Sequence, residues 1–166
     1  MKAVAQLAAR GYALLRSVGN SLQSPLLLLV RLYWGWQFLQ TGWGKLQHIH
    51  KVIGFFTSLG IPAPALNAWF VSGLEFVGGI LLIAGLGSRF ISLLLTVDMF
   101  VAYLTADRAA LASIISDPGK FYNADPYTFF FASLMILIFG PGRLALDYLL
   151  SLERKPVHSS RIRAAA

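Results

Sequence analysis

The chain has 166 residues, no cysteine, 57% hydrophobic residues and a formal net charge of +7, with a mean hydropathy of +0.65. The lack of cysteine excludes disulfides, thiolate-held iron–sulfur clusters and Cys-ligated zinc. The composition is too apolar for an ordinary soluble domain, and it predicts an integral membrane protein with about four spans of about 20 residues each. The basic residues flank the apolar blocks, as membrane orientation demands, so we expect no nucleic-acid partner.

The first segment, residues 1–23, is basic and contains no acid. Lys2, Arg10 and Arg16 are spread through it, and its apolar residues recur on one helical face. This pattern predicts an amphipathic helix lying on an anionic membrane surface, with the lipid bilayer as its partner. A mitochondrial-type presequence has the same Arg-rich, acid-free composition and remains an alternative.

The membrane domain is expected over residues 24–150. Pro25 suits the first turn of the first span, and Asp125-Pro126 reads as an N-cap and first-turn proline for the last. Between the third and fourth spans, a short surface helix is expected over 107–116. The fourth apolar core is short, which leaves open a re-entrant segment, although a full crossing is favoured. The four predicted spans are 25–43, 65–86, 90–106 and 124–140.

The distribution of Lys and Arg predicts the orientation. Most of these residues lie before the first span, in the turn Gly87-Ser88-Arg89 and in the basic tail, residues 151–166 with Arg143 just before it. That turn is tight, so we expect the second and third spans to be antiparallel neighbours. Positive residues accumulate in cytoplasmic segments. We therefore expect a multi-pass protein of the cell inner membrane with both termini cytoplasmic.

Three ionisable residues lie inside the apolar segments: Arg31, Glu75 and Asp98. Each costs roughly 2.5–3.5 kcal/mol on insertion scales, so such residues usually face a bundle interior and mark a site. At about 1.5 Å per residue, Glu75 and Asp98 reach a similar depth, and Arg31 can extend toward them. One buried cluster is predicted, in which an excess acid makes proton or quinol chemistry conceivable. Structural contact between helices is the alternative.

No metal site is expected. His48 and His50 form an isolated His-x-His pair without further ligands, so a loop pair that titrates near neutrality is the better interpretation. The stretch Thr41 to Lys45 lacks the spacing of a phosphate-binding loop. We find no catalytic triad and no dinucleotide glycine motif, so no catalytic residue is assigned.

The chain resembles the DoxX family of small four-helix membrane proteins over about residues 25–150. The resemblance depends on an ordered set of elements rather than on any one motif. These are Arg31, Gly35, Phe38, Gly42 and Lys45; then Phe55, Phe56, Gly60, Ile61 and Pro62; then Glu75, Gly78, Gly79 and Gly85 to Arg89; and finally Gly140 to Arg143 with Asp147.

The resemblance implies an all-α, membrane-embedded four-helix bundle in the inner membrane. Some relatives are linked to quinone-dependent oxidation or to membrane oxidoreductase complexes, so the leading hypothesis is a membrane component of a redox system. Arg31 and Glu75 would form its polar pair and Asp98 would carry protons. Lys45 and Arg143 would mark the membrane boundaries, with Arg143 pairing with Asp147 as an i,i+4 neighbour.

Several partners and functions remain open from the sequence. A quinone is the candidate cofactor, and an oxidoreductase or a second copy of the chain are candidate partners. The rival functions are a small-solute transporter that uses the same buried charges and a non-catalytic membrane scaffold of a larger complex. The sequence by itself does not separate these three.

Overall fold

The computed structural model describes residues 2–153, and within them the chain is helical with no strand. The all-α prediction is confirmed. The basic tail predicted over 151–166 lies almost wholly outside the described residues. The helices are α1 Lys2–Gln47, α2 Ile49–Ser58, α3 Pro64–Ala84, α4 Ser88–Thr105, α5 Arg108–Ala112, α6 Pro118–Tyr122, α7 Pro126–Phe139 and α8 Leu146–Glu153.

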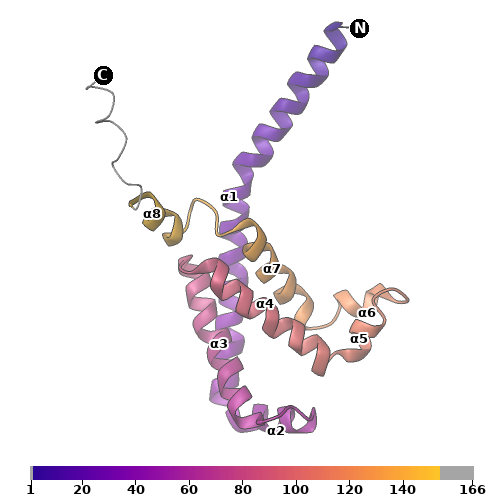
Figure 1. The fold of residues 1–166 in the computed structure, drawn as a ribbon, viewed down its shortest axis with the longest axis vertical. Helices are drawn as coiled ribbons and strands as arrows, with labels where there is room; N and C mark the ends of the chain where they lie inside the picture. Colours follow the sequence, from indigo (N-terminus) through magenta and orange to yellow (C-terminus); the bar gives the residue numbers. More distant parts are fainter. Residues whose placement is uncertain (1, 154–166) are drawn as a thin grey trace, which may run out of the picture.

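Helix α1 is the axis of the molecule (Figure 1). Its C-terminal half packs along α3, while α4 packs mainly against α7. Its N-terminal half projects beyond the other helices, at the same end as α8. The short helices α2, α5 and α6 lie toward the opposite end. The molecule therefore has one end built from α1, α8 and the α3–α4 turn, and another built from the short helices.

The helix start expected at Pro25 is wrong, because Pro25 lies inside the unbroken helix α1. An internal proline removes one backbone hydrogen bond and costs about 3 kcal/mol. Here long helix-forming runs on both sides continue the helix through it. The first predicted span is thus continuous with the basic N-terminal segment. Whether that segment lies on a membrane surface stays a prediction.

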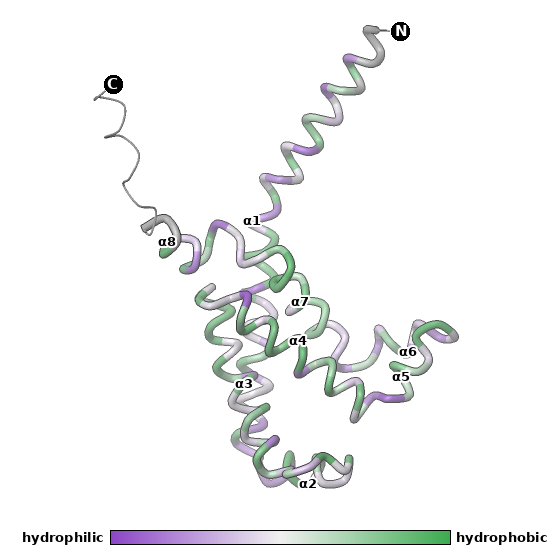
Figure 2. The backbone as a smooth tube through the Cα atoms, in the orientation of Figure 1, coloured by the Kyte–Doolittle hydropathy of each residue, from purple (hydrophilic) through white to green (hydrophobic). Residues whose placement is uncertain are grey.

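Helices α3 and α4 are both long and apolar enough to cross a membrane, and Figure 2 shows them as largely hydrophobic. They lie close to the predicted second and third spans. A tight turn joins them, with Gly85 at φ 71° and Gly87 at φ 59°. Such left-handed positions favour glycine, which has no Cβ to clash with its own backbone. The predicted close connection of these two spans is confirmed.

The last predicted elements are shorter than expected. Helix α7 ends at Phe139 because Gly140 has φ 80° and Pro141 cannot continue a helix. Pro126 lies in its first turn as predicted, but the Asp125 side chain makes no capping hydrogen bond. The surface helix expected over 107–116 forms only over Arg108–Ala112.

The α1–α3 contact is made by glycines that bring the two backbones together. A Cβ on Gly79 would lie 2.5 Å from the Gly35 carbonyl oxygen, and a Cβ on Gly42 would collide with the backbone of Phe76. Small residues allow such close packing. The contacts also set the register, since Gly42 is opposite Phe76 and Gly35 is opposite Gly79. A core that includes Phe38, Leu82, Leu95 and Ile136 packs around this crossing.

Candidate functional site: a charged pocket beside the α1–α3 crossing

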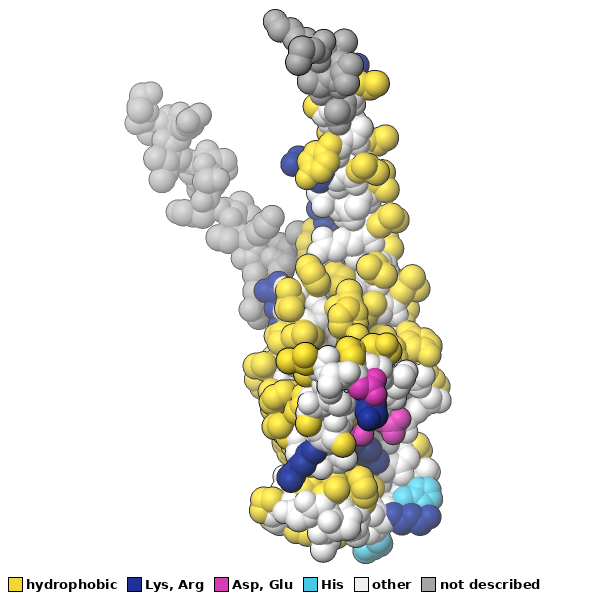
Figure 3. All heavy atoms as spheres, turned by 90° about the vertical axis from the view of Figure 1, so that its right-hand side faces the viewer, with side chains coloured by type: hydrophobic (Ala, Val, Ile, Leu, Met, Phe, Trp, Pro, Cys, Tyr) yellow, Lys and Arg dark blue, Asp and Glu magenta, His cyan; other side chains and the backbone are white. Residues whose placement is uncertain are grey.

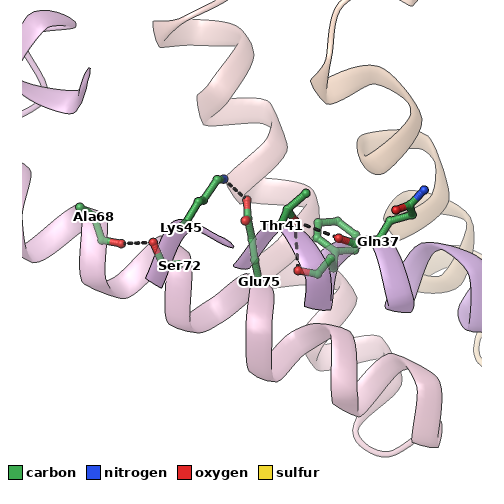
Figure 4. Close-up of polar contacts among 7 residues, drawn as sticks. Gln37, Thr41, Lys45, Ala68, Ser72 and Glu75 are labelled. Atoms are coloured by element: carbon green, nitrogen blue, oxygen red, sulfur yellow. Dashed lines mark hydrogen bonds and ion pairs between the residues drawn. The ribbon is translucent and has the colours of Figure 1, made fainter. Parts of the chain in front are cut away.

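The most prominent polar contact in the described part of the chain joins Lys45 of α1 to Glu75 of α3. Lys45 Nζ lies 2.6 Å from Glu75 Oε1 (Figure 4). The Glu75 side chain is only 2% exposed, whereas that of Lys45 is 36% exposed. The pair is therefore asymmetric, with a buried carboxylate held by a lysine that reaches in from the edge.

The register of the two helices explains this pair. Lys45 follows Gly42 by almost one turn, and Glu75 immediately precedes Phe76, the residue that Gly42 contacts. The close backbone approach at Gly42 thus brings a lysine and a carboxylate within direct reach. In the same region Ser72 donates to the Ala68 carbonyl at 2.6 Å, so its hydroxyl is satisfied within α3 (Figure 4).

The pair opens onto a pocket of about 630 Å³ between α1, α2, α3 and α4. Ligand pockets commonly enclose about 300–1,000 Å³. Its charged residues are Lys45, Lys51, Glu75, Asp98 and Arg108. The apolar wall includes Phe55, Phe56, Leu59, Ile61, Val71 and Met99. The pocket is thus apolar along its sides and carries ionisable groups, which suits an amphiphilic or aromatic small molecule.

Both carboxylates of the pocket carry an oxygen atom that is not satisfied. Glu75 Oε2 and Asp98 Oδ2 are buried and have no hydrogen-bond partner. Buried polar atoms without partners cost free energy, and such atoms in a native structure call for an explanation. Here both residues line one pocket, so a ligand that supplies hydrogen-bonding groups would satisfy them. The prediction that Glu75 and Asp98 share one site agrees with this arrangement.

Arg31 does not belong to this cluster, and the predicted Arg31–Glu75 pair is wrong. The side chain is 1% exposed, and its Nη2 donates to the Leu144 carbonyl at 2.7 Å. It lies beneath the α3–α4 turn, where a Cβ on Gly85 would collide with its guanidinium. The α1–α3 register that places Lys45 at Glu75 places Arg31 about four turns away, at the other end of the bundle.

The predicted pairing of Arg143 with Asp147 is also wrong. Asp147 accepts hydrogen bonds from the backbone N–H groups of Gly87 and Ser88, both at 2.8 Å. The negative charge of Asp147 also interacts electrostatically with the Arg31 guanidinium. Arg143 lies before α8 rather than on it, and its own N–H donates to the Ser24 hydroxyl at 3.2 Å. Asp147 therefore fastens α8 to the start of α4.

The sequence interpretation missed two groups of pocket residues. Lys51 and Arg108 were not singled out, and Phe55 and Phe56 were used only for the family resemblance. The amphipathic stretch after His48 was an available signal, because it predicts the helix α2, which carries Lys51, Val52, Phe55 and Phe56 of the pocket. Figure 3 shows that the acidic side chains of the face drawn lie in its lower half with several basic ones, below a mainly hydrophobic surface, while other basic side chains lie higher up.

Metal ligands are not grouped in the described residues, where no cluster of three or more His, Cys, Asp or Glu occurs. His48 is exposed, and its Nδ1 lies 3.0 Å from the Gly44 carbonyl oxygen.

Comparison with known proteins gives the family. The DoxX family profile matches residues 26–108. The chain belongs to the DoxX family, which is membrane-associated. A curated relative from Bacillus subtilis (strain 168), named "Putative oxidoreductase CatD", is 28% identical over 120 residues, which cover 72% of this chain and 83% of the relative. No solved structure is significantly similar to the chain.

Proposed function

We propose that this DoxX protein is a membrane component of a redox system and that its pocket binds a quinone. The observation that carries the proposal is the pair of unsatisfied carboxyl oxygens, Glu75 Oε2 and Asp98 Oδ2, in a pocket walled mainly by apolar side chains. The oxidoreductase name of the B. subtilis relative points in the same direction.

The pocket residues suit the two forms of such a ligand. The Lys45 ammonium can donate to a carbonyl oxygen, whereas the free oxygens of Glu75 and Asp98 can accept from a hydroxyl. Phe55 and Phe56 line the apolar wall and can pack against a ring. The polar groups of the pocket therefore suit both a carbonyl form and a hydroxyl form of the ligand. Each carboxylate can itself donate a hydrogen bond only when it is protonated.

The role of the protein in this proposal is to orient the ligand and to hold protons. Reduction of a bound quinone to the quinol would require two electrons and two protons. Glu75 and Asp98 are placed to take up and release protons at the pocket wall, and Lys45 stabilises the charged form of Glu75 after it has released its proton. The electrons would come from a partner oxidoreductase, which makes this chain the membrane part of a complex.

We extend the proposal to the membrane arrangement. Four spans, contributed by α1, α3, α4 and α7, would cross the inner membrane with both termini cytoplasmic. Support comes from the apolar lengths of α3 and α4 and from the position of α8 and the N-terminal half of α1 at one end (Figure 1). The pocket then opens toward the opposite side of the membrane.

The test compares quinone retention in the intact chain and in Glu75→Gln. Native mass spectrometry of the protein in lipid nanodiscs that contain ubiquinone or menaquinone would measure the bound fraction. We expect Glu75→Gln to weaken binding by about tenfold, or about 1.4 kcal/mol, with protein abundance unchanged. Asp117→Asn is the matched control, because Asp117 forms a solvent-exposed ion pair with Lys120.

Two other outcomes would replace the proposal. Equal loss of abundance and binding in Glu75→Gln would assign the pair to structural contact, in line with a scaffold. Solute uptake that depends on Glu75 and not on electron acceptors would indicate a transporter.

A further inference from the structure

One face of α1 carries exposed large apolar side chains over almost its whole length. They are spaced alternately three and four residues apart. Two positions of this pattern are occupied by Gly19 and Gln40 instead of a large apolar residue. We call this set the α1 stripe. Its members are Tyr12, Leu15, Leu22, Leu26, Leu29, Tyr33, Trp36 and Trp43, which are 50–72% exposed.

The spacing is that of a heptad repeat, in which the a and d positions form a seam against a partner helix. Leu15, Leu22, Leu29, Trp36 and Trp43 follow one another at seven-residue intervals and take the d positions. The bundle uses the opposite face of α1, where Leu27, Arg31, Gly35, Phe38 and Gly42 are buried. One helix therefore presents two separate faces, and only one of them is covered by the other described helices.

Lipid does not account for the whole α1 stripe. Its lower part runs along the half of α1 that packs on α3, whereas Tyr12 and Leu15 lie on the projecting half (Figure 1). Between these parts, Leu22 and Leu26 line a hollow beside Phe139 of α7 but stay more than half exposed. A helix that emerges straight from a membrane carries this upper part out of the hydrocarbon. A partner that covers both parts must itself continue from a membrane span into such an extension, and a second copy of this chain does so.

The residues beside the stripe permit this pairing. In a parallel dimer each g residue faces the e residue of the next heptad in the partner. The facing pairs would be Gly11 with Arg16, Val18 with Gln23, Pro25 with Val30, Leu32 with Gln37 and Leu39 with Gly44. None of these pairs brings like charges together, although the segment is basic and contains no acid.

We infer that the α1 stripe is the interface of a parallel homodimer in which two α1 helices pack from the projecting segment into the membrane. The two copies present the same surface to each other, as a two-fold axis requires. The interface is separate from the charged pocket, so it does not depend on the quinone proposal.

Cysteine crosslinking tests the inference directly, because the chain has no native cysteine. Leu15→Cys and Leu22→Cys lie on the stripe, whereas Ser17→Cys and Asn20→Cys are also at exposed positions but lie on the other side of the helix. In nanodiscs under mild oxidation, we expect the stripe variants to give at least about five times more disulfide-linked dimer than the controls. The reason is that the a and d residues of two parallel helices in a coiled coil approach each other closely. Equal crosslinking at all four positions, or none on the stripe, would overturn the inference.

A second variant measures the interface without a crosslink. Leu15→Glu combined with Leu22→Glu places four acids in the seam of a dimer, while Ser17→Glu with Asn20→Glu adds the same charge elsewhere. Native mass spectrometry should show loss of the two-chain mass only in the stripe variant. A two-chain mass that survives there, or a one-chain mass in the unmodified protein, would contradict the dimer.

Discussion

Helix α1 carries two cations on the same face that the bundle covers, and their surroundings differ. Arg31 is sealed at one end, where it donates to the Leu144 carbonyl beneath the α3–α4 turn. Lys45 lies at the other end, contacts Glu75 and faces a pocket. A buried charge in an apolar helix therefore does not by itself mark a site. The informative feature is whether unsatisfied polar atoms border a space that a ligand can enter.

The two ends also differ in what they hold together. At the sealed end, Asp147 binds the first backbone N–H groups of α4, so side chains serve to join helices. Arg31 at the sealed end and Glu75 and Asp98 at the pocket end all carry buried polar atoms without a hydrogen-bond partner, but only the two carboxylates line the charged pocket. Substitutions at the sealed end should therefore act on stability, and those at the pocket should act on ligand binding.

The largest effect is expected at the α1–α3 crossing, because the packing there holds both the sealed end and the pocket end in place. Gly79→Leu would force a side chain against the Gly35 carbonyl and the Leu39 backbone. Overpacking of this kind typically lowers stability by about 1–3 kcal/mol. Because the added side chain would meet backbone atoms, we expect a loss of about 3 kcal/mol or more for this variant. We expect loss of both abundance and quinone binding, measured by yield and native mass spectrometry.

Gly73→Ala is the matched control on the same helix, because a Cβ at Gly73 would contact nothing within 4 Å. It should leave yield and binding unchanged. A Gly79→Leu protein with normal yield would show that the crossing does not fix the register.

The next effect separates the two ends. Asp147→Ala removes both acceptors of the Gly87 and Ser88 N–H groups, and we expect a loss of about 2 kcal/mol of stability, since loss of a helix cap costs about 0.5–2 kcal/mol. Thermal unfolding in detergent would measure it, and the quinone affinity of the folded fraction should not change. An unchanged unfolding temperature would show that the Asp147 side chain contributes nothing to the stability of the sealed end.

The pocket end should show the reverse behaviour. Lys45→Met removes the partner of Glu75 and the proposed carbonyl donor, so we expect about tenfold weaker quinone binding, or about 1.4 kcal/mol. Lys51→Met is the control for charge, since Lys51 also lines the pocket but has no ion pair among the described residues. Equal weakening by both variants would indicate that net charge matters and not the Lys45–Glu75 contact.

The smallest effect concerns the packing of α4 on α7. The Thr96 hydroxyl lies 3.0 Å from the Ser133 hydroxyl and donates to it. Hydrogen bonds between membrane helices average about 0.6 kcal/mol, so Thr96→Val should lower stability by about that amount. Thr105→Val is the comparison, because the Thr105 hydroxyl bonds only to carbonyls of its own helix. A similar loss in both variants would assign the effect to local helix propensity.

Much of the fold could be read from local patterns. Apolar length predicted α3 and α4, and the glycines between them predicted the tight turn. The burial of Glu75 followed from its position in an apolar segment. The continuity of α1 through Pro25 was not predicted, because proline favours a helix start only when the preceding residues do not themselves continue the helix.

What only the tertiary structure decided is which charges meet. The sequence determined that the described chain is helical and that ionisable residues lie within its apolar helices, since hydropathy and turn chemistry act over a few neighbouring residues. Depth estimates brought Arg31 toward Glu75, but the glycine contacts between Gly42 and Phe76 set a register that brings Lys45 there instead. Register depends on how two distant surfaces fit, and a single sequence does not show that fit.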